Sequence, residues 1–141
     1  MWPRDFHERL LNWNGMREQC LTMSVHDALT KINAWWFQSP WSAYHLHWDD
    51  QQDWPDPWQL LNDNQYCPVA RGLGIMYTIA MLDREDLQDV QMIEYQSDNL
   101  VLVAREKYIL NWDPDQVVNI SLGKSKPRRQ VSQEQIKQKI R

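Results

Sequence analysis

The chain has 141 residues, a length that corresponds to one domain with room for a sizeable hydrophobic core. Its two cysteines, Cys20 and Cys67, are too few for a disulfide framework, so we expect both thiols to be free. No stretch approaches the roughly twenty apolar residues that a membrane span needs. The N-terminus also lacks the apolar run of an export signal. These features predict a soluble, cytoplasmic protein without a membrane partner.

Tryptophan and charge are distributed unevenly along the chain. Seven of the nine tryptophans fall between Trp13 and Trp58. Rings of this size fill cores, and they also carry much of the binding energy at protein interfaces. Residues 1–120 hold 8 Lys and Arg against 18 Asp and Glu, whereas residues 121–141 hold 7 basic residues and 1 acidic one. The sequence therefore predicts an acidic body with a basic tail.

Two helices are predicted before residue 40. Asp5 can cap a short first helix, which the pair Asn14-Gly15 should end. Ser24 has the residue type of an N-cap, and apolar residues recur after it at helical spacing. We therefore expect the second helix to span Val25–Phe37.

The segment over residues 39–57 is rich in Pro, Asp, Gln and Trp and shows no sustained periodicity. This composition predicts a long ordered loop whose rings fasten it to the body, and such loops are often functional or interfacial. A turn of helix should follow, with Asp56 as its cap and Pro57 at its first position. We expect the tryptophans in and beside the loop to form a protein-binding surface, namely Trp41, Trp48, Trp54 and Trp58.

Cys67 precedes an apolar segment in which Arg71 is the only charged residue. Proline is favoured at the first helical position, so Pro68 predicts a helix start with Cys67 at or beside the N-cap. A helix N-terminus favours the thiolate form of a cysteine, which makes Cys67 a candidate nucleophile. We expect residues 68–82 to form a buried central helix. Its two glycines indicate that another backbone or a large ring passes close to it.

The periodicity then changes from helical to strand-like. Short β-branched and aromatic runs alternate with turn residues over Val90–Tyr95, Leu100–Arg105, Tyr108–Trp112 and Val117–Ile120. They predict an antiparallel meander that packs on the central helix. The expected fold class is therefore α+β, with one domain over residues 1–122.

The tail over residues 123–141 is polar and basic, with Ile136 and Ile140 as its apolar residues at helical spacing. Such a segment cannot form a core alone, so we expect a flexible arm that is extended or partly helical. Its charges could bind an acidic protein surface, which we rank first, or the phosphates of a nucleic acid. The candidate contact residues are Lys124, Lys126, Arg128 and Arg129.

Two loop histidines are the candidates if a metal binds. His45 and His47 would point to the same side of an extended segment and are followed by Asp49 and Asp50. However, no HExxH or CxxC frame accompanies them, and loop histidines commonly bond to nearby carbonyls. The sequence therefore predicts no metal centre and no cofactor.

The order of elements over Val25–Pro114 resembles the transglutaminase-like superfamily, which has a papain-type fold. In that family an aromatic lead-in precedes G-x-G-D-C, and the cysteine heads the central helix. The lead-in in this chain is W-P-D-P-W-Q-L-L, and the nucleophile segment is N-D-N-Q-Y-C-P-V-A-R-G-L-G. The resemblance implies this fold and gives Cys67 the nucleophile's position.

The same resemblance implies a histidine at the start of one strand and an aspartate at the end of the next. This chain has Asp98 or Asn99 at the first position and Asn111 at the second. No histidine follows Cys67, although a histidine of the preceding loop could serve, because Cys–His catalysis depends on geometry and not on chain order. The implied domain is therefore catalytically disarmed.

Two functions are compatible with these residues. The first is a non-catalytic interaction or structural protein that serves as a component or assembly factor of a larger complex. The sequence is similar in style to small accessory proteins of T4-like tailed bacteriophages, which build necks, tails and baseplates, so a virion is an expected location. The alternative is a cysteine hydrolase or acyl transferase that uses Cys67.

Overall fold

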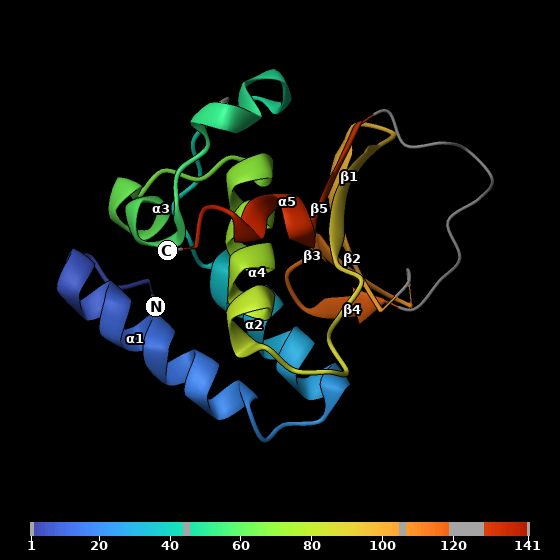
Figure 1. The fold of residues 1–141 in the computed structure, drawn as a ribbon. Helices are drawn as coiled ribbons and strands as arrows, with labels where there is room; N and C mark the ends of the chain where they lie inside the picture. Colours follow the sequence, from blue (N-terminus) through green and yellow to red (C-terminus); the bar gives the residue numbers. More distant parts are fainter. Residues whose placement is uncertain (1, 44–45, 105–106, 119–128, 141) are drawn as a thin grey trace.

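The computed structural model describes residues 2–43, 46–104, 107–118 and 129–140. Helices occupy the N-terminal half and a five-stranded antiparallel sheet the C-terminal part, which confirms the α+β class (Figure 1). The helices are α1 (Phe6–Cys20), α2 (Val25–Phe37), the 3-10 helix η1 (Trp48–Asp53), α3 (Pro57–Asp63), α4 (Pro68–Leu82) and α5 (Gln133–Lys137). The strands are β1 (Gln91–Tyr95), β2 (Asp98–Val103), β3 (Tyr108–Asp113), β4 (Gln116–Val118) and β5 (Arg129–Ser132).

Helix α1 is longer than the sequence predicted. Asp5 caps it as expected, since its side chain accepts from the N–H of His7. The helix does not end at Gly15 but continues to Cys20. Nothing lies within 4 Å of the position that a Gly15 Cβ would take, so the glycine occupies open space at the helix surface. The buried face continues beyond it through Met16, and this packing outweighs the low helix propensity of glycine.

The helices α2, α3 and α4 confirm their predicted starts. Ser24 accepts from the N–H of Asp27 at the start of α2, and Asp56 accepts from Gln59 at the start of α3. Pro68 opens α4 with Cys67 as its N-cap. The first N–H groups of a helix have no partner within it. Cap residues bond to these groups and N-terminal prolines lack one, so the sequence alone predicts where such helices begin.

Helix α4 is the centre of the molecule, buried on nearly all sides between α1 and α2 and one face of the sheet (Figure 1). Its glycines allow these close approaches. A Cβ on Gly74 would lie 2.5 Å from the ring of Trp36, and one on Gly72 would meet the sulfur of Met92. The predicted close neighbours of this helix are thus a tryptophan ring from α2 and a side chain from β1.

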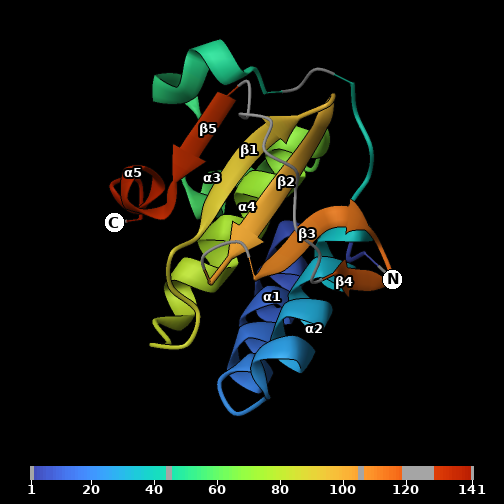
Figure 2. The ribbon, with the colours of Figure 1, turned by 90° about the vertical axis from the view of Figure 1, so that its right-hand side faces the viewer.

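The sheet has the strand order β4-β3-β2-β1-β5. Its first four strands form the predicted antiparallel meander. The fifth strand was not predicted: β5 adds to the outer edge of β1, opposite β4 (Figure 2). Helix α5 follows directly and packs on α4, with Ile136 buried.

The prediction of a separate C-terminal arm is therefore wrong for residues 129–140, which belong to the packed domain. A terminal helix was expected around Ile136, and it is present, but docked. The strand was missed because R-Q-V-S carries a single apolar side chain, Val131, which reaches the core. Residues 123–128, with Lys124, Lys126 and Arg128, lie outside the described residues.

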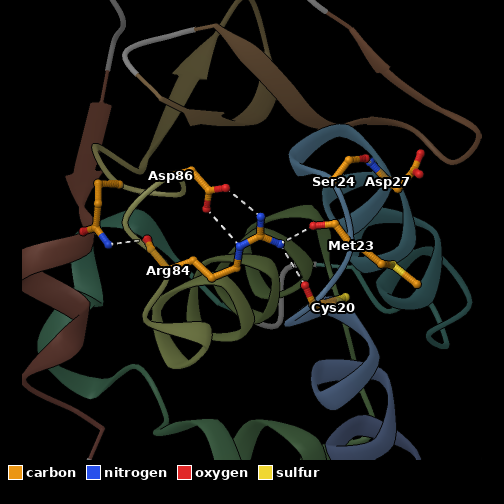
Figure 3. Close-up of polar contacts among 7 residues, drawn as sticks. Cys20, Met23, Ser24, Asp27, Arg84 and Asp86 are labelled. Atoms are coloured by element: carbon orange, nitrogen blue, oxygen red, sulfur yellow. Dashed lines mark hydrogen bonds and ion pairs between the residues drawn. The ribbon is translucent and has the colours of Figure 1, made fainter.

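Arg84 joins two turns at the far end of α4 (Figure 3). Its guanidinium donates to the carbonyl of Cys20, the last residue of α1, at 2.8 Å and to that of Met23, in the turn before α2, at 2.7 Å. Asp86 accepts from the same guanidinium at 2.9 and 2.6 Å. The hydrogen bond from Arg84 lowers the pKa of the Asp86 carboxyl. These bonds fix the end of α4 opposite to Cys67.

Candidate functional site

Cys67 lies at the N-cap of α4, where the sequence placed it, and the residue is only 3% exposed. The N–H of Leu46 donates to its sulfur at 3.4 Å, and the thiol lies 3.8 Å from the carbonyl of Leu46. In the described part of the chain, the polar neighbours of this sulfur are therefore main-chain groups of the loop that precedes α3. No imidazole from the described residues is among them.

The resemblance implies a histidine at Asp98 or Asn99. Asp98 is exposed at the first position of β2. Asn99 follows it in the strand. Its side-chain oxygen accepts from the indole N–H of Trp48 at 2.8 Å, and its carbonyl accepts from the Asn111 amide at 2.7 Å. A carboxamide is not a base under ordinary conditions. This position therefore anchors the loop and does not supply a proton acceptor.

Asn111, at the implied aspartate position, connects α4, β2 and α2. Its side-chain amide donates to the carbonyls of Pro68 at 2.9 Å and Asn99 at 2.7 Å, while its main-chain N–H donates to Asn33 at 2.8 Å. Its φ of 67° lies in the left-handed region, which asparagine tolerates better than most residues. A carboxylate could not donate to the two carbonyls. The amide is therefore required by this hydrogen-bond network.

Arg71 completes the network and places a cation one helical turn after Cys67. Its Nε donates to the side-chain oxygen of Asn111 at 2.5 Å, and its guanidinium lies 3.8 Å from the ring centroid of Phe37. Burial lowers the pKa of Arg71 to about 10, and the charge of an ionised Cys67 would act in the opposite direction. Arg71 is thus a cation at neutral pH.

A hollow of about 550 Å³ opens beside Cys67. Such a volume falls within the range of small ligand sites. One wall is apolar, and the rim carries charged and polar groups. The lining residues are Trp41, Ala43, Leu46, His47, Trp48, Asp49, Cys67, Pro68, Val69, Glu94, Asn99 and Arg129.

The four tryptophans predicted to form an exposed surface do not behave alike. Trp41 is 71% exposed and stands at the hollow. Trp48 and Trp54 are buried, at 5% and 4%, and their rings meet edge to face with centroids 5.7 Å apart. Trp58 is partly buried. The prediction of an exposed ring is therefore wrong for Trp48 and Trp54, because their indoles fasten the loop from within.

The remaining candidates are placed as follows. Arg129 lies in β5, and its guanidinium is 3.5 Å from the Asp49 carboxylate. His47 is exposed and lines the hollow, whereas His45 lies outside the described residues. Within the described ranges, no group of three or more His, Cys, Asp or Glu side chains could hold a metal ion.

Sequence reasoning missed Arg71 and Asn33 as members of the site. Both carry a detectable signal, since each is a polar residue within an apolar helical stretch that would otherwise be buried. A buried polar side chain needs partners, and here each partners Asn111. The pairing itself depends on contacts 40 and 78 residues apart in sequence, which periodicity does not reveal.

Comparisons of the chain with protein-family models, curated proteins and solved structures give no match. None of the helices in the described part of the chain has the length and apolar character needed to cross a bilayer.

Proposed function

We propose that this chain is a non-catalytic interaction protein of transglutaminase-like fold, which binds a partner protein through the hollow beside Trp41. One observation carries the proposal: a 71% exposed tryptophan stands at a hollow with an apolar wall and a polar rim. The side chains of Asn99 and Asn111 are amides engaged in hydrogen bonds. Among the described residues, no imidazole is hydrogen-bonded to the Cys67 sulfur, which supports a surface for binding.

The chemistry around Cys67 supports the non-catalytic half of the proposal. Nucleophilic catalysis by a thiol needs a base within hydrogen-bond reach, oriented by a third group. Asp98 or Asn99 and Asn111 hold the positions that the resemblance implies for these groups, and both asparagines have their side chains in structural hydrogen bonds. The sulfur itself is covered by Leu46. These contacts stabilise the fold, and they occupy groups that a catalytic dyad would use to bind and deprotonate its substrate or nucleophile.

The surroundings of Trp41 support the binding half. Exposed tryptophans beside apolar pockets are frequent binding hot spots, particularly where a polar rim excludes water. Leu46 and Val69 contribute to the apolar wall, while Asp49 and Arg129 lie at the rim. An apolar side chain of a partner would thus be buried against Trp41 and oriented by the charged rim.

The assembly that we propose is a larger protein complex, such as the neck, tail or baseplate of a tailed-phage virion. The style of the sequence supports this choice, as does the contrast between an acidic body and a basic C-terminal region. Contacts of that basic region with an acidic protein surface rank above contacts with nucleic acid. The proposal requires no cofactor.

The test is the recovery of the protein in its natural assembly, purified from the source cells or virions and quantified by mass spectrometry. We expect the wild-type chain to co-purify with the assembly, and the variant Trp41→Ala to lose at least tenfold in recovery, because a hot-spot tryptophan contributes about 2 kcal/mol or more. Trp112→Ala is the matched control, since that ring is 51% exposed but does not line the hollow.

Recovery of Trp41→Ala at the wild-type level would contradict the proposed surface. An equal loss for both tryptophan variants would contradict it as well, because the effect would then not be specific to the hollow. A wild-type protein absent from every purified assembly would contradict the proposed function itself.

One observation favours the alternative of a cysteine hydrolase: His47 and Cys67 line the same hollow. In that case Cys67 would react with iodoacetamide faster than the thiol of a reference peptide at neutral pH, and His47→Ala would abolish the excess. A slow reaction that is unaffected by His47→Ala would exclude this use of the pair.

A further inference from the structure

The loop over residues 46–54, which we call the strap, crosses the start of α4 and includes η1. Its inner side is held by two bonds to the body. Leu46 donates to the Cys67 sulfur at 3.4 Å, and the Trp48 indole donates to Asn99 at 2.8 Å. The strap also closes on itself, since the indole of Trp54 donates to the carbonyl of His47 at 2.9 Å.

The outer side of the strap is held by the C-terminal segment, residues 129–140. The Arg129 guanidinium lies 3.5 Å from the Asp49 carboxylate, and the Lys139 ammonium donates to the carbonyl of Gln52 at 3.2 Å. Figure 2 shows η1 close to the start of β5, where Arg129 lies. Both contacts are exposed, so each contributes little, and water or a competing ligand can replace either one.

The strap buries much less of its surface than α4 does. Within η1, Trp48 is buried, but the other side chains are exposed or partly exposed. The helical geometry is also interrupted at Asp50, whose φ and ψ are −109° and 35°. Segments with few buried apolar contacts open at lower free energy than the core of the same protein. The buried rings of Trp48 and Trp54 therefore provide most of the packing that keeps the strap on the body of the protein.

We propose that the strap opens as a unit while the core stays folded, that opening uncovers Cys67, and that loss of the Arg129 and Lys139 contacts makes opening more frequent. The C-terminal segment then acts as a clamp that an acidic partner could release by competing for its two cations. Opening of the strap does not require the proposed function, although Leu46, Asp49 and Arg129 also line the hollow.

Cys20 provides an internal control for this proposal. It is fully buried in α1, and its thiol faces the carbonyl of Ala28 at 3.8 Å, far from the strap in sequence and on other elements. Burial raises the pKa of Cys20, whereas Lys31 and Arg84 act in the opposite direction. Its reaction requires a larger unfolding event. For each variant, the labelling rate relative to wild type is therefore compared at the two cysteines. A rise at Cys67 alone indicates local opening of the strap, and a rise at both indicates global unfolding.

The experiment measures iodoacetamide labelling of both cysteines in the native protein by peptide mass spectrometry. The double variant Arg129→Ala, Lys139→Ala should label at Cys67 about two to thirty times faster than wild type, since exposed contacts contribute about 0.2–1 kcal/mol each. Cys20 should keep its wild-type rate. Lys137→Ala, in the same C-terminal segment, is the matched control and should stay within about twofold of wild type at Cys67, since no strap contact of Lys137 occurs among the described residues.

A second variant and a second measurement make the test independent of thiol chemistry. Trp48→Phe keeps a ring but removes the bond to Asn99, so it should also speed labelling of Cys67 several-fold without changing Cys20. Amide hydrogen exchange over residues 46–54 should rise in the double variant, while exchange over α4 stays slow. An unchanged Cys67 rate, or an equal rise at Cys20 or across α4, would overturn the proposal.

Discussion

Four of the tryptophans form two groups of two that are buried to a similar extent but stabilise different parts of the molecule. In the first group, the indoles of Trp13 and Trp36 both donate to the hydroxyl of Thr78, at 3.0 and 2.9 Å, in the middle of α4. In the second group, Trp48 and Trp54 bond to Asn99 and to the loop's own backbone. The first group joins three helices, whereas the second fastens one loop.

The buried fraction of a side chain therefore does not determine how much that side chain contributes to the global stability of the protein. A ring that lies between well-packed helices supports every element around it, and its loss leaves a cavity that the core cannot easily fill. A ring that pins a short polar segment supports that segment alone. Substitutions in the two groups should therefore lower global stability and local stability, respectively.

The largest effect is expected in the core group, from Gly74→Ala. The new Cβ would lie 2.5 Å from the ring of Trp36, which is buried and hydrogen-bonded to Thr78 and so cannot move aside easily. Overpacking of this kind costs about 1–3 kcal/mol. Urea unfolding should therefore show a lower midpoint with an unchanged slope.

Gly15→Ala is the matched control for this prediction. The Cβ of that variant meets nothing within 4 Å in α1, so the substitution should stabilise the protein by about 0.5–1 kcal/mol through the higher helix propensity of alanine. Equal effects of the two glycine variants would contradict the close contact between α4 and Trp36.

A smaller effect is expected at the junction of core and strap, where the hydroxyl of Tyr77 in α4 donates to the carbonyl of Pro55 at 2.7 Å. Burial raises the pKa of Tyr77, with a further contribution from Asp56, and burial also raises that of Tyr66. A raised pKa means that the unfolded chain loses these protons first. The contribution of these two phenols to the free energy of unfolding is therefore fully present below about pH 10, and it is lost as the pH rises beyond that value.

Tyr77→Phe should therefore cost about 1 kcal/mol at neutral pH and make the alkaline decline in stability less steep. Urea titrations at several pH values between about 8 and 11 would measure both effects. Tyr95→Phe is the control, because Tyr95 is only partly buried in β1. An alkaline decline that Tyr77→Phe leaves unchanged would contradict the role of this buried phenol.

Local sequence signals predicted the helices α2, α3 and α4 and the first four strands well, because caps, prolines and periodicity act over a few residues. They failed for β5, which holds one core side chain and depends on pairing with β1, about 35 residues earlier in the chain. They also failed for the end of α1, where tertiary packing overrides the stop signal at Gly15.

For the candidate site, the sequence predicted some of the residues that are involved but not the contacts that they make. The sequence placed Cys67 at a helix start, and the resemblance gave Asp98 or Asn99 and Asn111 in place of a histidine and an aspartate. It could not show that Asn111 donates to two carbonyls or that Trp48 bonds to Asn99, because these contacts join distant elements.

The rate of Cys67 alkylation in the native wild-type protein tests the non-catalytic account most directly. The measurement compares iodoacetamide labelling at pH 7 with that of a short peptide containing Q-Y-C-P, and follows both by mass spectrometry. Because Leu46 covers the sulfur and the residue is 3% exposed, we expect labelling at least about tenfold slower than in the peptide. Labelling faster than the peptide would contradict the account and would point to a reactive thiol.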